Sequence, residues 1–266
     1  RGIRCHRTAR AQPPSADPAG TTGLRNFEVR PQVHFVAPSE KELHWQYAEI
    51  FEQGGYADIV LPERATVVDV GANIGLFAVF VKGLFPDARI QAFEPMPEAA
   101  AALRDNISLH RLTGIEVEQR ALGAIREESV EFTYYPVLPG NSTRYPDEKE
   151  LQKEVLSREE PVEDVERQHT GYPVRVAVER LSSYLKPEQN IDLLKIDVEG
   201  AELEVLRGID DRHWPLVRQA VLEVQDLNGR LRAVCELLQS HGMRSHVRPS
   251  PMIPADIRTF MVHATR

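Results

Sequence analysis

The sequence predicts an α/β fold in which a mostly parallel sheet carries helices on both faces. Short apolar segments typical of buried strands alternate with helical segments of about a dozen residues, which is the pattern of βαβ units. A glycine-rich turn follows the first of these strands at residues 71–75. The 266 residues, of which 42% are hydrophobic and 27% charged, suit one globular domain with an arm.

The chain ahead of the first core strand divides into an arm and a helix. Residues 1–38 predict a flexible arm or linker, because the segment opens with Pro, Ala, Arg and Gly in no periodic pattern. Ser39 with Glu42 three residues later is a helix-start pattern, and apolar residues then recur at helical spacing until Gly54. We therefore expect a helix over residues 39–56, at the start of a domain over 39–266.

The alternation continues through this domain. Strands are predicted at 65–70, 88–94, 114–122, 128–137, 172–178, 191–198 and 219–225, and helices at 74–85, 97–110, 181–185, 201–209 and 229–242. Residues 243–247 and 256–265 predict a final antiparallel hairpin. An acidic insertion over 146–170 interrupts the pattern, with nine acidic and four basic residues between Asp147 and Arg167. We expect this insertion to be solvated, with a docking surface for a basic partner as the alternative.

Composition and charge argue against several functions. A formal net charge of −8 argues against a nucleic-acid partner, because phosphate contacts need clustered Lys and Arg. No apolar run approaches the ~20 residues that cross a bilayer, so no membrane partner is expected. The two cysteines form neither a disulfide framework nor a metal motif, which favours a cytoplasmic protein.

The stretch V-V-D-V-G-A-N-I-G at 67–75 predicts a nucleotide site beyond the carboxyl end of the first strand. It lacks the Lys and the Ser or Thr of a phosphate-binding P-loop. Asn73 stands where a dinucleotide turn needs a glycine to approach a pyrophosphate. Asp69 would repel phosphate but suits an ammonium group. Glu94, at the end of the next strand, can hold ribose hydroxyls. A nucleoside with an amino-acid tail is S-adenosylmethionine.

The motif L-L-K-I-D-V-E-G-A-E-L-E-V-L at 193–206, taken with this turn and with residues 92–107, resembles the FkbM-type methyltransferases. The resemblance implies a class I, Rossmann-like fold whose mostly parallel, seven-stranded sheet ends in an antiparallel hairpin. It also implies S-adenosylmethionine as cofactor. By this similarity the cofactor-binding residues are Asp69, Gly71, Asn73, Gly75, Glu94, Pro95, Met96, Ala121, Leu122 and Asp197.

The same resemblance implies transfer of a methyl group to a hydroxyl of a natural-product intermediate. The chain starts at Arg1 with a linker-like arm, so we expect the domain to be part of a megasynthase whose polyketide or peptide is tethered to a carrier protein. A stand-alone enzyme acting on a sugar or another small molecule is an alternative. A non-catalytic cofactor-binding module and an NAD-dependent dehydrogenase are further alternatives.

Carboxylates at the ends of two neighbouring strands are expected beside the transferred methyl group. In one interpretation Asp197 or Glu199, with Glu223 nearby, takes the proton of the acceptor hydroxyl. In the other, Asp197, Glu223 and Gln225 hold a divalent ion such as magnesium; the metal-free interpretation is favoured.

Four further side chains are candidates for the acceptor side. His34 and His44 precede the first core strand, where a cover over the acceptor would lie, so either is a candidate general base. Asn141 and Ser142 can donate hydrogen bonds to the acceptor or the cofactor. Tyr47, in a helix that also fits the family, is expected near the acceptor.

Overall fold

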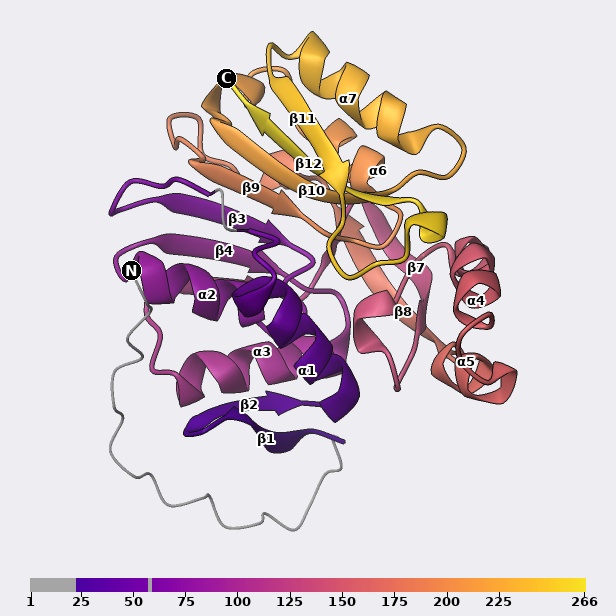
Figure 1. Ribbon diagram of the computed structural model, residues 1–266. Coiled ribbons are helices and arrows are strands. Elements are labelled where there is room, and N and C mark those ends of the chain that lie inside the picture. Colours follow the sequence, from indigo (N-terminus) through magenta and orange to yellow (C-terminus); the bar gives the residue numbers. More distant parts are fainter. Residues whose placement is uncertain (1–22, 57–58) are drawn as a thin grey trace.

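A seven-stranded sheet forms the centre of the protein, as seen in the computed structural model, which describes residues 23–56 and 59–266 (Figure 1). The strand order is β11-β12-β10-β9-β3-β4-β5. Five strands are parallel: β3 (Thr66–Val70), β4 (Arg89–Phe93), β5 (Ile115–Glu118), β9 (Leu193–Ile196) and β10 (Gln219–Gln225). The predicted C-terminal hairpin, β11 (Arg244–Pro249) and β12 (Thr259–Thr265), pairs antiparallel with β10. The predicted fold class is confirmed.

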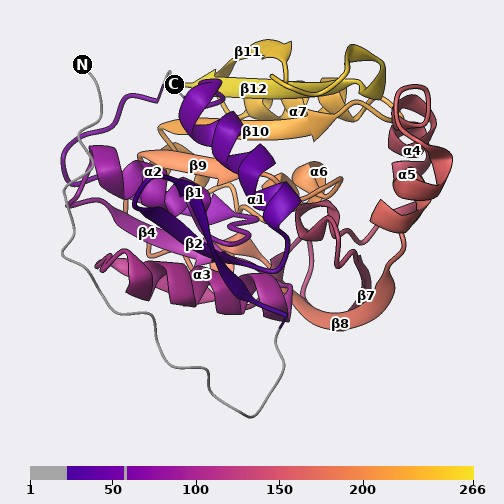
Figure 2. The ribbon, with the colours of Figure 1, turned by 60° about the horizontal axis from the view of Figure 1, so that its bottom comes forward.

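Helices cover both faces of this sheet (Figure 2). One layer contains α1 (Glu40–Tyr47), α2 (Leu76–Leu84) and α3 (Pro97–Leu109), and the other contains α6 (Glu202–Arg207) and α7 (Arg230–Ser240). Successive strand residues point to opposite faces, so Val67 packs in the first layer and Val68 in the second. Within the described ranges, no helix has the length and apolar character that crossing a membrane would need.

Helix α1 begins as the sequence predicts, because Ser39 accepts a hydrogen bond from Glu42 N (3.4 Å). It continues into a π-helical turn over Ala48–Glu52. Short 3-10 turns lie at Pro139–Asn141, Pro146–Lys149, Leu181–Ser183, Trp214–Leu216 and Ala255–Ile257. The helix predicted at 181–185 is one of these turns.

A second, small sheet lies beyond the carboxyl ends of the parallel strands (Figure 1). Its order is β6 (Ala121–Leu122), β8 (Tyr172–Glu179) and β7 (Glu127–Tyr134). The strand predicted at 114–122 is therefore two strands in different sheets, since the chain turns where Arg120 N donates to Glu118 O (2.9 Å). The insertion between β7 and β8 folds as α4 (Glu150–Leu156) and α5 (Val162–Gln168).

The prediction of a flexible arm over 1–38 is wrong for its last part. A hairpin of β1 (Arg25–Arg30) and β2 (Val33–Ala37) packs on α3. Asn106 of α3 accepts a hydrogen bond from Val36 N (2.7 Å) and donates one to Val36 O (2.9 Å), while Phe35 is fully buried. Buried apolar area and satisfied backbone groups hold this segment in place. Residues 1–22 lie outside the described ranges.

Candidate functional site

A cavity of about 300 Å³ opens at the carboxyl ends of β3, β4, β9 and β10. Its walls also include residues of α1, the loop 138–142 and the insertion. This volume lies at the small end of the range for small-molecule sites. Most of the predicted site residues line the cavity: Gly71, Asn73, Glu94, Pro95, Met96, Ala121, Leu122, Asn141, Ser142, Asp197, Glu199, Glu223 and Gln225.

The glycine-rich turn places the backbone of β3 directly against the end of β9. Gly71 has a φ of 78°, and a Cβ atom there would overlap with the carbonyl oxygen of Asp197. Asn73 follows with a φ of 47°, a left-handed conformation that Asn tolerates. Gly75, at the start of α2, does not line the cavity. It packs against Leu103 of α3. The turn therefore needs glycine at residue 71 for its close approach to β9.

Glu94 is held at the end of β4 by two backbone amides. Its Oε2 accepts a hydrogen bond from Asn73 N (2.9 Å), and its Oε1 accepts one from Met96 N (2.8 Å). Burial outweighs these two donors and raises the pKa of Glu94 to about 7. The carboxylate is thus oriented before any ligand arrives, at the strand end where a ribose-binding acid is expected.

Asp69 does not reach the cavity, which corrects its predicted role. Its side chain is 0% exposed and lies 3.1 Å from the ammonium of Lys195, its neighbour across β3 and β9. Neither Asp69 oxygen has a donor in good hydrogen-bond geometry among the described residues, so the pairing is mainly ionic. Lys195 Nζ also donates to Gly71 O (2.6 Å) and lies 3.6 Å from Asp197 Oδ2. The sequence offered one signal for Lys195, a lysine inside an otherwise apolar strand.

A group of carboxylates occupies the part of the cavity beyond β9 and β10. Glu49 comes from the π-helical turn after α1 and shares a hydrogen bond with Glu223 of β10. Ser250 Oγ donates to Glu223 Oε2 (2.9 Å). Burial and the nearby Asp197 raise the pKa of Glu49 to about 8 and that of Glu223 well above its ordinary value. The pair can therefore hold a proton near neutral pH.

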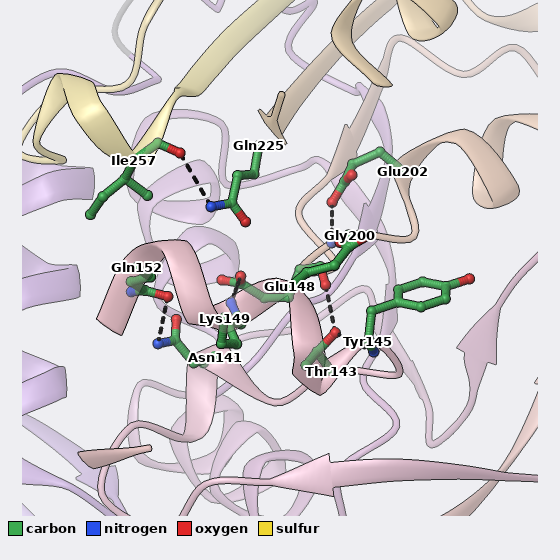
Figure 3. A network of polar contacts seen from close by, with 12 residues as sticks. Asn141, Thr143, Tyr145, Glu148, Lys149, Gln152, Gly200, Glu202, Gln225 and Ile257 are labelled. Atoms are coloured by element: carbon green, nitrogen blue, oxygen red, sulfur yellow. Dashed lines mark hydrogen bonds and ion pairs between the residues drawn. The ribbon is translucent and has the colours of Figure 1, made fainter. Parts of the chain in front are cut away.

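The insertion closes one side of the cavity, which corrects the expectation of a fully solvated segment. Buried Lys149 forms an ion pair with Glu199, and Thr143 Oγ1 donates to the backbone oxygen of Glu199 (2.6 Å) (Figure 3). Arg230 of α7 donates to both carboxylate oxygens of Glu148, each at 2.6 Å. These contacts attach the insertion to the loop after β9 and to α7.

The loop 138–142 carries two predicted contacts whose side chains already have partners. Asn141 Nδ2 donates to Gln152 Oε1 of α4 (3.3 Å), which ties the loop to the insertion (Figure 3). Ser142 Oγ accepts a hydrogen bond from Tyr135 N (3.3 Å). Both residues line the cavity, so their contact with an acceptor or cofactor stays a prediction.

The structure places three of the other candidates outside the cavity lining. His34 is exposed on β2, 3.9 Å from Glu28 Oε1, and His44 is exposed on α1. Tyr47 stacks on Phe51 with ring centroids 4.6 Å apart. Helix α1 instead directs Glu42 and Gln46 into the cavity, and Glu49 of the following π-helical turn also lines it, at the i, i+4, i+7 spacing of one helical face. Sequence reasoning missed this polar stripe because it treated Glu42 as a capping residue.

The residues named for a divalent ion do not form a metal site. Gln225 Nε2 donates to Ile257 O (3.2 Å) (Figure 3). Glu223 pairs with Ser250 and Glu49. Across residues 23–56 and 59–266, no three His, Cys, Asp or Glu side chains are grouped so that they could hold a metal ion.

Comparison with known proteins identifies what the chain resembles. Residues 69–261 match the family model described as the Methyltransferase FkbM domain. "Methyltransferase 1" of Beauveria bassiana is 35% identical over 236 residues, 87% of this chain and 94% of that protein. The "31-O-demethyl-FK506 methyltransferase FkbM" of Streptomyces tacrolimicus is 37% identical over 225 residues, 79% of this chain and 85% of that protein.

A solved structure shows the same fold. The crystal structure of a methyltransferase FkbM from Methylobacillus flagellatus KT superposes with a TM-score of 0.52 at 14% identity. The match covers 82% of this chain and 47% of that one, so this chain spans about half of the solved protein. The architecture is the class I methyltransferase, Rossmann-like fold.

Proposed function

This chain belongs to the FkbM methyltransferase family, and we propose that it transfers the methyl group of S-adenosylmethionine to a hydroxyl oxygen of a natural-product intermediate. One observation carries the proposal: the cavity joins an oriented acid at the end of β4 to a proton-holding carboxyl pair formed by Glu223 of β10 and Glu49 of the π-helical turn. The name of the Streptomyces relative describes methylation of an oxygen, which supports a hydroxyl acceptor here.

The residues at the β4 side fit an adenosine. Glu94 is fixed so that its carboxylate can accept hydrogen bonds from ribose hydroxyls. Met96, Ala121 and Leu122 are buried side chains that line the neighbouring wall and suit an adenine ring. When bound, S-adenosylmethionine supplies an electrophilic methyl group on its sulfonium. Glu94 and this wall would orient the nucleoside, and Asp197 would border the methyl-bearing end.

The carboxyl pair of Glu49 and Glu223 is assigned as the acceptor of the hydroxyl proton. A general base works best when its pKa is close to the working pH, and burial brings Glu49 to about 8. The O–H proton of the acceptor passes to the unprotonated carboxylate of the pair, which leaves the oxygen free to bond to carbon. Glu199 is less suited to this role because Lys149 already pairs with it.

The solvent side of the cavity favours an acceptor with an apolar body. Trp45 and Met252 both line the cavity and are 38% and 41% exposed. Such exposed apolar side chains bind hydrocarbon surface and leave a hydroxyl to the polar interior. This arrangement suits a hydroxylated natural-product skeleton, either free or delivered by a carrier protein.

The test is mass spectrometry of methyl transfer. The purified chain is incubated with S-adenosylmethionine and a panel of hydroxylated acceptors, free and carrier-bound, with and without chelator. We expect the gain of one methyl on at least one acceptor, and loss of turnover in Glu223→Gln. Glu40→Gln, an exposed carboxylate of α1 outside the cavity lining, is the matched control. Tight cofactor binding without transfer to any acceptor would instead favour a non-catalytic module.

A further inference from the structure

Two buried side-chain oxygen atoms of residues that line the cavity have no hydrogen-bond partner among the described residues. Glu42 is 8% exposed, and its Oε1 accepts hydrogen bonds from Gly140 N (2.6 Å), Gln46 Nε2 (2.6 Å) and Asn73 Nδ2 (3.4 Å). Its Oε2 has no hydrogen-bond partner in the part of the chain that the structure describes, and the same holds for Asn73 Oδ1. Both residues line the cavity. Buried acceptors without donors are rare in folded proteins and call for an explanation.

Three separate segments build this position: α1, the turn after β3, and the loop 138–142. The loop meets the other two at Gly140, whose amide donates to Glu42. A Cβ atom on Gly140 would lie 2.5 Å from Glu42 Oε1 and 2.8 Å from Gln46 Nε2, so a larger residue here would displace both side chains. Because Asn73 turns its amide nitrogen toward Glu42, its oxygen remains as an acceptor.

The missing partner is a group with several donors and a positive charge. Burial raises the pKa of Glu42 to about 8, and the carboxylates of Glu94 and Glu199 that face it add to the rise. Glu199 is itself paired with Lys149, which leaves that cation already engaged. An ammonium group carries three donors and one charge, so it can satisfy both orphaned atoms and let Glu42 ionise.

We propose that Glu42 and Asn73 bind the ammonium group of the amino-acid tail of S-adenosylmethionine. The inference rests on the proposed function. It gives the role predicted for Asp69 to Glu42, because Asp69 is sealed beneath the turn and paired with Lys195. The same ligand can reach both sites, because the backbone amide of Asn73 donates a hydrogen bond to Glu94, the acid assigned to the ribose.

Calorimetry of ligand binding tests this assignment without relying on turnover. S-adenosylhomocysteine carries the tail, whereas 5′-methylthioadenosine lacks it. At pH 7, in buffers of different ionisation enthalpy, the wild type should release about one proton on binding S-adenosylhomocysteine, as Glu42 ionises. Glu42→Gln should abolish this release and weaken that ligand about 10- to 100-fold, with less than about a threefold effect on 5′-methylthioadenosine.

The matched control is Glu40→Gln on the same helix, which should bind both ligands as the wild type does. If Glu42→Gln does not fold, Glu42→Asp, which retracts the charge by one methylene, should show the same selectivity with a smaller effect. Equal binding of S-adenosylhomocysteine by Glu42→Gln and wild type refutes the inference alone. Equal weakening of both ligands also refutes it, because the site would then serve the nucleoside. Failure of the wild type to bind S-adenosylhomocysteine overturns the proposed function as well.

Discussion

Lys195→Met should destabilise the folded protein by about 2–4 kcal/mol at pH 7. The change leaves the carboxyl group of Asp69 buried without its cation and removes the donor to Gly71 O. Asp69 can then escape ionisation only by taking up a proton. Protonating a carboxyl group of ordinary pKa 3.8 at pH 7 costs about 4 kcal/mol, because each unit between the pKa and the pH costs about 1.4 kcal/mol. Burial already raises the pKa of Asp69 in the native protein, so this figure is an upper limit.

Urea unfolding followed by circular dichroism measures the effect. At pH 5 the same reasoning limits the loss to about 2 kcal/mol, because less free energy is needed to protonate Asp69. The double variant Lys195→Met/Asp69→Leu should recover most of the stability, since no charge remains buried. The exposed Lys186→Met is the control. A loss below about 1 kcal/mol at pH 7, equal losses at both pH values, or no recovery in the double variant would refute the reasoning.

Three further predictions concern the turn, the insertion and the carboxyl pair. Gly71→Ala should destabilise the protein by about 1–3 kcal/mol and weaken S-adenosylhomocysteine binding, measured by urea unfolding and calorimetry, because the new Cβ overlaps with a backbone carbonyl; wild-type values for both would contradict this. Arg230→Met should increase hydrogen exchange in α4 and α5, whereas Arg232→Met, an exposed change on the same helix, should not; equal exchange in both variants would count against the attachment of the insertion. The pKa of Glu49 is raised from 4.5 to about 8 in the folded protein. The contribution of this shift to folding stability is therefore complete below pH 4.5 and is lost as the pH rises through 8. Between pH 4.5 and 8 the unfolding free energy should therefore decline with pH less steeply in Glu49→Gln than in the wild type, by about 1.4 kcal/mol per pH unit. Urea unfolding at several pH values measures this, and the same pH dependence in both proteins would contradict the assignment.

Local patterns predicted the frame of the site well. Alternating strands and helices are encoded by hydrophobic periodicity, and Glu94 follows its strand directly, so both were readable without tertiary structure. The turn at 71–75 was recognisable because its backbone conformation restricts which residues can occupy it. The hairpin over 25–37 was missed, since only packing on α3 distinguishes it from a linker.

Local sequence patterns could not predict which way a side chain points or which distant residues pair with each other. Asp69 and Lys195 are 126 positions apart in sequence order, from 69 to 195, and only the register of β3 with β9 joins them. The sequence marks Glu42 as a capping residue, and only the hydrogen bond from the distant Gly140 amide shows its position beside the loop 138–142.

The sequence by itself determined the sheet, its reactive edge and the type of nucleotide expected there, because these depend on periodicity and on residues adjacent in the chain. Only the tertiary structure decided which carboxylates face the cavity and which are neutralised beneath it. Burial, orphaned donors and acceptors, and ion pairing arise from contacts between distant segments, and these contacts set both the charge of each carboxyl group and the ligand it can bind.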